Sequence, residues 1–333
     1  MINLDDKRVN FALRAVQQAA SLAADVQGEL ISEAITKDDR SPVTVADFAA
    51  QAIVGSMLEE AFPGELLVGE EAADVLRSSE ERGTLENITN FVGRLISGVT
   101  PEYVCDLIDR GVDSPGENYW TLDPIDGTKG FLRGAQYATA LAYVENGVVQ
   151  LGVLGCPNIT PDLEENIGGA GSLAIAVRGQ GSWIATLKDP IREDSFSQLS
   201  VSPQIDPVKA RLMRSFESAH TNTDQIDAFQ NKLGGKADPV RMDSQVKYAL
   251  LASGEGEVYL RLLSSDRPDY REKIWDQAAG SIIVEEAGGI VTDLDGKALD
   301  FSQGRTLKMN RGICATNGIL HQQALDALSA VQA

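Results

Sequence analysis

The chain has 333 residues and a formal net charge of −20 at pH 7, and 43% of its residues are hydrophobic. This length exceeds that of one typical core, so we expect two closely packed units, an N-terminal α+β unit over residues 1–200 and a C-terminal α/β unit over residues 201–333. The acidity argues against a nucleic acid or an anionic membrane as a partner, and no run of about 18 apolar residues indicates a membrane span.

Two helices are predicted near the N-terminus, one over residues 9–26 and one from Asp47 to about residue 62. Apolar residues of the first follow helical spacing, so we expect both helices to pack side by side against a sheet. The next apolar run predicts a strand that ends in Glu70 and Glu71. Because strand side chains alternate, only one of these two acids is expected to point into a shared site. Taken alone, each acid is explained better as a helix-start residue or a solvated strand end than as a functional residue.

Residues 72–118 are predicted to form a polar insertion with one helix, which either overhangs a site or decorates the surface. After it, an apolar run ending at Leu122 predicts a buried strand, and the following Asp-Pro-Ile-Asp-Gly sequence predicts a tight turn. Asp123 and Asp126 on this stiff turn would be close enough to share a hard cation such as Mg²⁺. The backbone N–H groups of Gly127 and Thr128 could add an anion-binding nest. The alternative is an ordinary Asp-rich β-turn.

The rest of the chain predicts an antiparallel sheet followed by alternating strands and helices. A hairpin is expected over residues 137–155 through Asn146-Gly147, then strands near 172–178 and 182–187, and a linker over 188–209. Later strands are expected near 211–216, 257–263, 290–293 and 312–315, and helices near 223–233, 244–253, 274–287 and 317–331. His321 is predicted to lie on the surface of the last helix.

Four motifs occur in one order along the chain: an Asp before the second helix, Gly-Glu-Glu at a strand end, Asp-Pro-Ile-Asp-Gly-Thr, and Trp-Asp-Gln-Ala-Ala-Gly at 275–280. Together they resemble the lithium-sensitive, Mg²⁺-dependent phosphatase superfamily of inositol monophosphatase and fructose-1,6-bisphosphatase. The resemblance implies an α+β fold, a layered αβαβα sandwich, with two or three Mg²⁺ ions per site. The implied metal ligands are Glu70, Asp123, the carbonyl of Ile125, Asp126 and Asp276. Asp47 and Thr128 would orient and deprotonate the attacking water.

Three further segments, at 243–248, 256–261 and 270–276, resemble the 3'(2'),5'-bisphosphate nucleotidase branch of this superfamily. Residues 217–221 are similar to its His-containing substrate loop. The implied substrate contacts are Gly127, Thr128, His220, Ser244, Lys247, Arg261 and Asp276. Simpler explanations exist for four of them, namely helix capping for Ser244 and solvated polar or charged side chains for the others. The sequence departs from the fungal and plant pattern in having Gln277 where His is frequent and Thr-Asn-Thr after His220.

The resemblance predicts hydrolysis of the 3'-phosphate of 3'-phosphoadenosine 5'-phosphate, with its sulfated relative as a second substrate, and inhibition by Li⁺. The N-terminal unit would carry the metal-binding turn, and the C-terminal unit would carry the substrate contacts. One rival is an inositol phosphate or sugar bisphosphate phosphatase with the same metals. Another is a non-catalytic Mg²⁺- or nucleotide-binding regulator.

The N-terminal residues 1–7 lack a hydrophobic signal core. Cys105, Cys156 and Cys314 are odd in number and widely spaced, which fits buried or free thiols in a reducing compartment. We therefore expect a cytoplasmic protein that acts on a small-molecule nucleotide bisphosphate, and we predict no protein partner.

Overall fold

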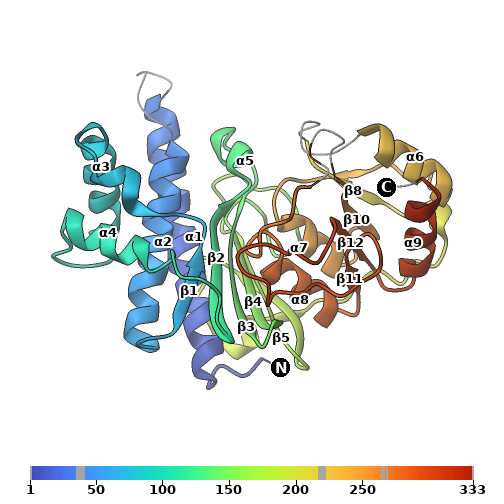
Figure 1. Ribbon diagram of the computed structural model, residues 1–333, viewed down its shortest axis with the longest axis horizontal. Coiled ribbons are helices and arrows are strands. Elements are labelled where there is room, and N and C mark those ends of the chain that lie inside the picture. The colour runs from blue at the N-terminus through green and yellow to red at the C-terminus, as the bar shows by residue number, and fades with distance from the viewer. Residues whose placement is uncertain (1, 35–41, 217–222, 264–266, 268, 332–333) are drawn as a thin grey trace.

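The computed structural model of the chain describes residues 2–34, 42–216, 223–263, 267 and 269–331. Its elements form five layers in the order helices, sheet, helices, sheet, helices (Figure 1). The predicted α+β class and the layered αβαβα sandwich are confirmed. The division into units at residue 200 is not tested by this arrangement and stays a prediction.

The first sheet has seven strands in sequence order, from β1 to β7. Only the pair β1–β2 is parallel, and the other neighbours are antiparallel. The strands are β1 (Leu66–Gly69), β2 (Asn118–Asp126), β3 (Ala138–Glu145), β4 (Val148–Cys156), β5 (Ser172–Val177), β6 (Gly181–Thr186) and β7 (Ser197–Gln198). As predicted, β3 and β4 form a hairpin whose turn residues Asn146 and Gly147 both have positive φ angles.

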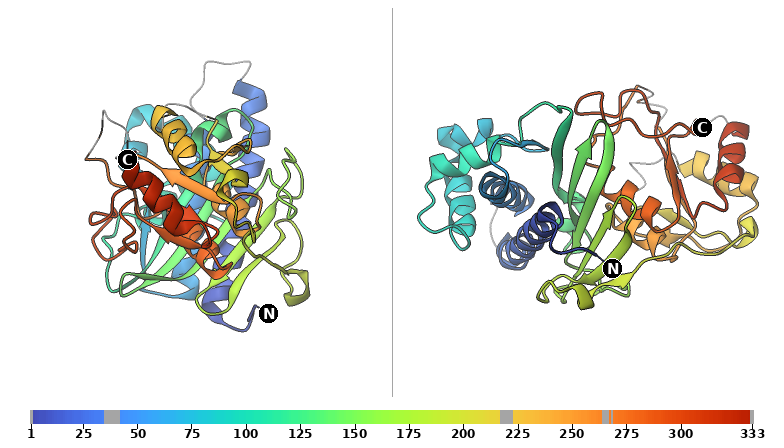
Figure 2. Two further views of the ribbon diagram at one scale, coloured as in Figure 1. Left: turned by 90° about the vertical axis from the view of Figure 1, so that its right-hand side faces the viewer. Right: turned by 90° about the horizontal axis from the view of Figure 1, so that it is seen from below.

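Helices α1 (Lys7–Ala34) and α2 (Pro42–Ala61) lie side by side on one face of this sheet, as predicted (Figure 2). Their apolar side chains pack with those of β2 to β5 in one core cluster, which includes Val16, Leu141 and Val153. The other face is covered by α7 (Val246–Ala252) and α8 (Ala278–Glu286). Both helices are apolar almost all round, because they are buried between the two sheets.

The second sheet has the order β11-β12-β10-β8-β9. Its strands are β8 (Leu212–Arg214), β9 (Val240–Arg241), β10 (Val258–Arg261), β11 (Ile290–Thr292) and β12 (Ile313–Thr316). Helices α6 (Thr223–Leu233) and α9 (His321–Ala330) pack on its outer face. His321 is buried and not on the surface as predicted, because its ring lies between the hydroxyls of Thr292 (3.1 Å) and Thr316 (3.0 Å).

The polar insertion at 72–118 contains more structure than the single predicted helix. Besides α3 (Arg82–Val92), it forms α4 (Pro101–Asp109) and two short 3₁₀ helices, Ala73–Arg77 and Ser79–Glu81. The start of α4 follows a local rule, because the Thr100 hydroxyl accepts a hydrogen bond from the Tyr103 N–H and proline occupies the first turn. Both α3 and α4 pack on α2, on the side away from the sheet (Figure 1).

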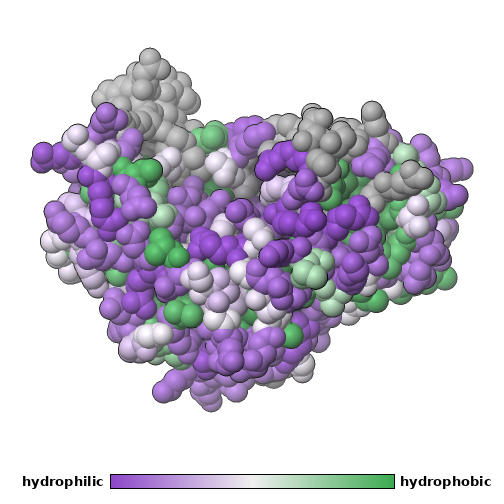
Figure 3. All heavy atoms as spheres, in the orientation of Figure 1, coloured by the Kyte–Doolittle hydropathy of each residue, from purple (hydrophilic) through white to green (hydrophobic). Residues whose placement is uncertain are grey.

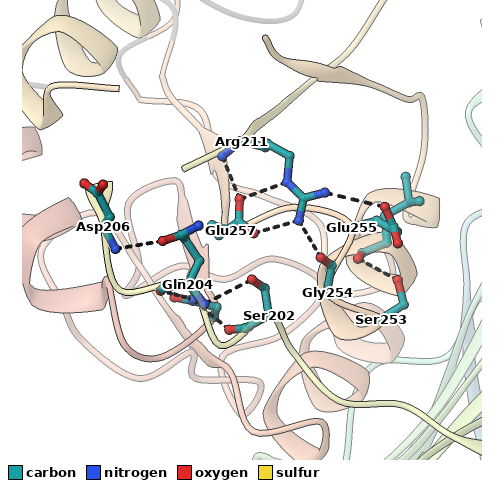
Figure 4. A network of polar contacts seen from close by, with 10 residues as sticks. Ser202, Gln204, Asp206, Arg211, Ser253, Gly254, Glu255 and Glu257 are labelled. Atoms are coloured by element: carbon teal, nitrogen blue, oxygen red, sulfur yellow. Dashed lines mark hydrogen bonds and ion pairs between the residues drawn. The ribbon is translucent and has the colours of Figure 1, made fainter. Parts of the chain in front are cut away.

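The expected linker at 188–209 is not free of regular structure, because it contains β7, which pairs with β6 in the first sheet. Its last part is held beside the second sheet by polar contacts (Figure 4). Just after it, the guanidinium of Arg211 donates to the buried carboxylate of Glu257 at 2.7 Å and to the Gly254 carbonyl at 2.5 Å. The Asn317 amide donates to the carbonyls of Ser202 and Gln204, both at 2.9 Å. These bonds fix the path of the chain between the two sheets.

Hydrophilic side chains cover most of the face of the molecule drawn in Figure 3, in keeping with the charge of −20. Within the described ranges, no helix combines the length and the apolar character needed to cross a bilayer. The three cysteines are free and buried, as predicted.

Candidate active site

The candidate site lies where β1 and β2 end. Because these two strands are parallel, their carboxyl ends meet at one edge of the first sheet, which brings Glu70 close to Asp123 and Asp126. The predicted tight turn after Leu122 is wrong, because β2 continues through Asp126 and the chain turns only at Gly127. Asp123 is still within the ladder, opposite Ala140, and the register shifts before Asp126. The irregular backbone at this point turns β2 into helix α5 (Thr128–Leu132).

Gly127 is the residue that permits this turn. Its φ angle of 96° lies in the left-handed region, and a Cβ atom built on it would be only 2.8 Å from the Cβ of Ser244. Ser244 itself has a φ of 62°, which is unusual for a residue with a side chain, and it delays the start of α7 to Val246. The segment before α7 therefore lies directly against the turn between β2 and α5.

Buried carboxyl groups gather around this contact. Burial raises the pKa of Asp123 well above its usual range, and the neighbouring carboxyls of Glu70, Asp126 and Asp276 raise it further. Burial also raises the pKa of Asp276 to about 8, against the opposing charge of Arg261. The pKa of Glu70 is raised by burial and by Asp126, although its side chain is exposed. Three acids at the edge of the first sheet and one from the segment before α8 thus repel one another across a short distance.

The prediction that only one of Glu70 and Glu71 would face the site needs correction. Strand β1 ends at Gly69, so the alternation of side chains does not continue through the two acids. Glu70 lies near Asp126 and Asp123, whereas Glu71 lies near Asp47. The pKa of Asp47 is raised mainly by burial and further by the charge of Glu71. The pKa of Glu71 is itself raised to about 7, mainly by burial.

The arrangement fits a hard divalent cation. Asp123 is only 2% exposed, and its Oδ1 atom has no hydrogen-bond partner. A buried carboxylate oxygen without a partner, surrounded by other carboxylates, is costly unless a proton or a cation neutralises it. In the ranges that the structure describes, no group of three or more Asp, Glu, His or Cys side chains is placed to hold a metal ion, so metal binding would require these acids to move closer together.

Asp126 has the most polar contacts in this cluster. Its Oδ2 accepts a hydrogen bond from the backbone N–H of Gln245 at 2.5 Å. The pKa of Asp126 is raised by burial, but Lys247, Arg261 and Gln245 limit the increase. The Gln245 side chain donates to the Trp275 carbonyl and accepts from the Gly280 N–H, both at 3.0 Å. Gln245 therefore links the β2 turn to the segment that carries Asp276.

Two cations face the acids from the second sheet and α7. Arg261 Nε lies 2.9 Å from Glu272 and its Nη2 lies 4.0 Å from Asp276. Lys247 is 4% exposed, and its Nζ contacts Ser215 Oγ and the Met242 carbonyl, both at 3.2 Å. Burial lowers the pKa of Lys247 to about 8, with Asp126 opposing that effect. These positions contradict the simpler explanation of Lys247 as a solvated helix residue.

The remaining predicted residues are placed as follows. Asp47 is buried on α2 and Thr128 is exposed at the start of α5, and in the described part of the chain no hydrogen bond joins their side chains. Ile125 is buried in the turn. The Ser244 hydroxyl accepts from the Val246 N–H at 3.2 Å, a local capping contact. His220 lies outside the described residues.

Several residues that support this site were assigned no role in it from the sequence. They are Glu71, Gln245, Glu272, Gln277 and Arg305. Gln245 and Glu272 lie inside segments that were singled out, but nothing in the sequence distinguishes them from their neighbours. Arg305 follows a glycine in a polar loop and has no local signal.

The chain is similar to known proteins over nearly its full length. The family model described as "Inositol monophosphatase family" matches residues 5–333. A Schizosaccharomyces pombe protein named 3'(2'),5'-bisphosphate nucleotidase is 40% identical over 98% of this chain and 96% of its own. An Oryza sativa protein of the same name is 42% identical over 95% and 92%.

Solved structures show the same fold at low identity. An inositol monophosphatase (IMPase) from Thermotoga maritima has a TM-score of 0.65 at 20% identity and covers 98% of both chains. CysQ from Bacteroides thetaiotaomicron, titled a bacterial member of the inositol monophosphatase family, has a TM-score of 0.64 at 19% identity and covers 95% of this chain and 99% of its own. With a family match over nearly the full length and relatives at about 40% identity, the chain belongs to the inositol monophosphatase family.

Proposed function

We propose that this chain is a metal-dependent 3'(2'),5'-bisphosphate nucleotidase that hydrolyses the 3'-phosphate of 3'-phosphoadenosine 5'-phosphate to AMP and phosphate. The family is generally metal-dependent, and the relatives named above cover nearly the whole chain. The observation that carries the proposal is the buried Asp123 carboxylate, with an unpartnered oxygen, among three further acids from both halves of the chain.

Glu70, Asp123, Asp126 and Asp276, with the carbonyl of Ile125, would hold two or three Mg²⁺ ions. Bound Mg²⁺ supplies positive charge that stabilises the phosphoryl oxygens and makes an attacking water more acidic. Oxygen donors on a rigid turn suit Mg²⁺, and the repulsion among these acids supports the assignment, because a cation removes it.

The Thr128 hydroxyl would take the proton of the attacking water and pass its own proton to Asp47. The raised pKa of Asp47, caused mainly by burial, suits a group that takes up a proton. The backbone N–H groups of Gly127 and Thr128 would bind the scissile phosphate at the start of α5.

The second phosphate would be bound by cations that face the acids. Lys247 and Arg261 provide positive charge in a strongly acidic protein, with Ser244 and His220 as further contacts. Their charge acts locally, whereas the net charge of −20 is screened beyond about 10 Å at 0.1 M salt. The sulfated relative of the substrate would bind the same groups.

We also infer that two units meet near residue 200, because the first sheet ends at Gln198 and the second begins at Leu212. The enzyme would act on its small-molecule substrate in the cytoplasm without a protein partner. Three free, buried thiols support a reducing location.

A phosphate-release panel tests the function. It compares 3'-phosphoadenosine 5'-phosphate, its sulfated form, inositol monophosphate and fructose 1,6-bisphosphate, each with Mg²⁺ and with or without Li⁺. We expect the highest kcat/KM for the adenosine bisphosphate, inhibition by Li⁺, and a selective loss for that substrate in Arg261→Ala.

Two rivals make different predictions in this panel. An inositol phosphate or sugar bisphosphate phosphatase would prefer one of the other substrates, and Arg261→Ala would leave its kcat/KM nearly unchanged. A non-catalytic regulator would bind Mg²⁺ and nucleotide but release no phosphate.

A further inference from the structure

One segment of the second half of the chain reaches across to the first sheet. It lies between β11 and β12, and the Phe301 carbonyl accepts a hydrogen bond from the buried Tyr119 hydroxyl at 2.6 Å. Four residues later, the Arg305 carbonyl accepts from the Ile274 N–H at 3.3 Å. Arg305 therefore has its backbone beside the Asp276 segment while the loop rests on β2.

The Arg305 side chain points the other way, to the end of β1. Its guanidinium donates hydrogen bonds to three backbone carbonyls, those of Gly69, Gly111 (3.2 Å) and Asp113 (3.1 Å). Gly69 immediately precedes Glu70. The Gly69 N–H also donates to the Gly111 carbonyl at 2.8 Å, so the guanidinium joins two backbone segments that are already paired.

The same guanidinium lies over the ring of Trp275, with 4.8 Å between its central carbon and the ring centroid. Trp275 immediately precedes Asp276. One planar group thus contacts the residue before each of two acids that belong to opposite halves of the proposed metal site. Burial lowers the pKa of Arg305 and Glu70 opposes that effect, which shows that the cation lies within the influence of this acid.

We propose that Arg305 is a positioning residue that sets the separation of Glu70 and Asp276 and thereby the affinity of the site for divalent metal. The inference rests on the proposed function, because it takes these acids as ligands. Several donors in a fixed plane can hold the Gly69 and Gly111 carbonyls while the face of the group packs on Trp275. A lysine in this position would keep the charge but could not maintain all of these contacts.

Metal affinity measured without substrate tests the proposal. Mn²⁺ serves as the probe, and the free ion is counted by electron paramagnetic resonance in the full-length protein. Outer contacts that orient metal ligands change affinity by about 10- to 100-fold. We expect Arg305→Met to weaken Mn²⁺ binding at least about tenfold, and Arg305→Lys to weaken it by an intermediate factor.

Two control variants separate positioning from general structural damage. Arg211→Met removes an arginine that also bridges backbone and carboxylate, but in the second sheet, and should lower Tm while leaving the Mn²⁺ Kd within about twofold. Arg82→Met removes an exposed arginine on α3 and should change neither. In kinetic assays, Arg305→Met should raise the Mg²⁺ concentration for half-maximal rate, with much of kcat recovered at saturating Mg²⁺.

Three results would overturn the inference: a wild-type Mn²⁺ Kd in Arg305→Met, a wild-type Kd in Arg305→Lys, or an equal loss in Arg211→Met. If Arg305→Met does not fold, the comparison of Arg305→Lys with wild type decides. A wild-type protein that binds Mn²⁺ but hydrolyses none of the panel substrates would refute the proposed function and leave the role of Arg305 testable. A wild-type protein that binds no Mn²⁺ would refute both.

Discussion

Replacing Gln277 with methionine should lower the stability of the fold and leave the Arg261 side chain less well positioned. The Gln277 side chain is completely buried, and its Nε2 donates to Glu272 Oε2 at 2.9 Å while its Oε1 accepts from the Tyr248 hydroxyl at 2.5 Å. The same Glu272 oxygen lies 2.9 Å from Arg261 Nε. A continuous chain of contacts therefore runs from α7 through Gln277 to the proposed phosphate-binding arginine.

The size of the effect follows from the bonds that are lost. The Glu272 carboxylate loses a hydrogen bond, and a hydrogen bond to a charged group contributes about 1.5–3 kcal/mol to stability. The Tyr248 hydroxyl is left buried without a partner, which costs about 1–3 kcal/mol. Methionine nearly keeps the volume of glutamine, so the cavity contribution is small. We expect the free energy of unfolding to fall by about 3–5 kcal/mol. A less constrained Arg261 should raise KM for the adenosine bisphosphate about tenfold, equivalent to about 1.4 kcal/mol.

Urea unfolding and steady-state kinetics measure the two effects separately. Asn317→Leu is the matched control, since this buried amide makes hydrogen bonds with Ser202, Gln204 and Leu320 in the second half of the chain. It should cost comparable stability but leave KM unchanged. If Gln277→Met loses stability and retains a wild-type KM, the link from Gln277 to Arg261 is refuted.

Three further predictions concern single buried groups. Asp123→Asn should abolish phosphate release yet raise Tm in EDTA at pH 8, because the raised pKa of Asp123 makes its ionised form destabilising there; unchanged turnover or a lower Tm would contradict this. Glu257→Gln should cost about 1–3 kcal/mol at pH 7, since Arg211 is partly exposed. Burial alone would raise the pKa of Glu257, but hydrogen bonds from Arg211 hold it below its usual value, so the difference in urea midpoint from wild type should shrink as the pH falls below about 4.3. Burial lowers the pKa of His321, so the stability of the protein should fall as the pH drops through about 6.5. In His321→Gln, the free energy of unfolding should depend less steeply on pH between about pH 7 and 5. The same pH dependence in the variant and the wild type would exclude a contribution of His321.

Hydrophobic periodicity and turn residues are local signals, and they predicted most of the strands and helices, whereas the layered arrangement was predicted from the family resemblance alone. Asn146-Gly147 marks its hairpin, and the acids after Leu122 mark the turn at the end of β2. Strand β9 was missed because two residues carry no periodicity, and α4 was missed although Thr100 and Pro101 mark its start.

The contacts that support the site were beyond reach of such signals. Gln245 donates its backbone N–H to Asp126. Every residue except proline has this donor, so the identity of residue 245 does not reveal the contact. The left-handed conformation of Ser244 depends on its packing against Gly127. Burial of His321 depends on two threonines from different strands, which the helical pattern around it does not reveal.

The acids of the site are divided between the two halves of the chain, and this division has a consequence for synthesis on the ribosome. The turn with Asp123 leaves the ribosome roughly 150 residues before Asp276, which at 5–20 residues per second is a delay of about 8–30 s. For most of that interval the nascent chain carries the repelling carboxylates of Glu70, Asp123 and Asp126 without Lys247 and Arg261, which later face them. Completion of the second sheet is therefore the step at which a newly made chain gains its capacity to hold cations and becomes catalytically competent.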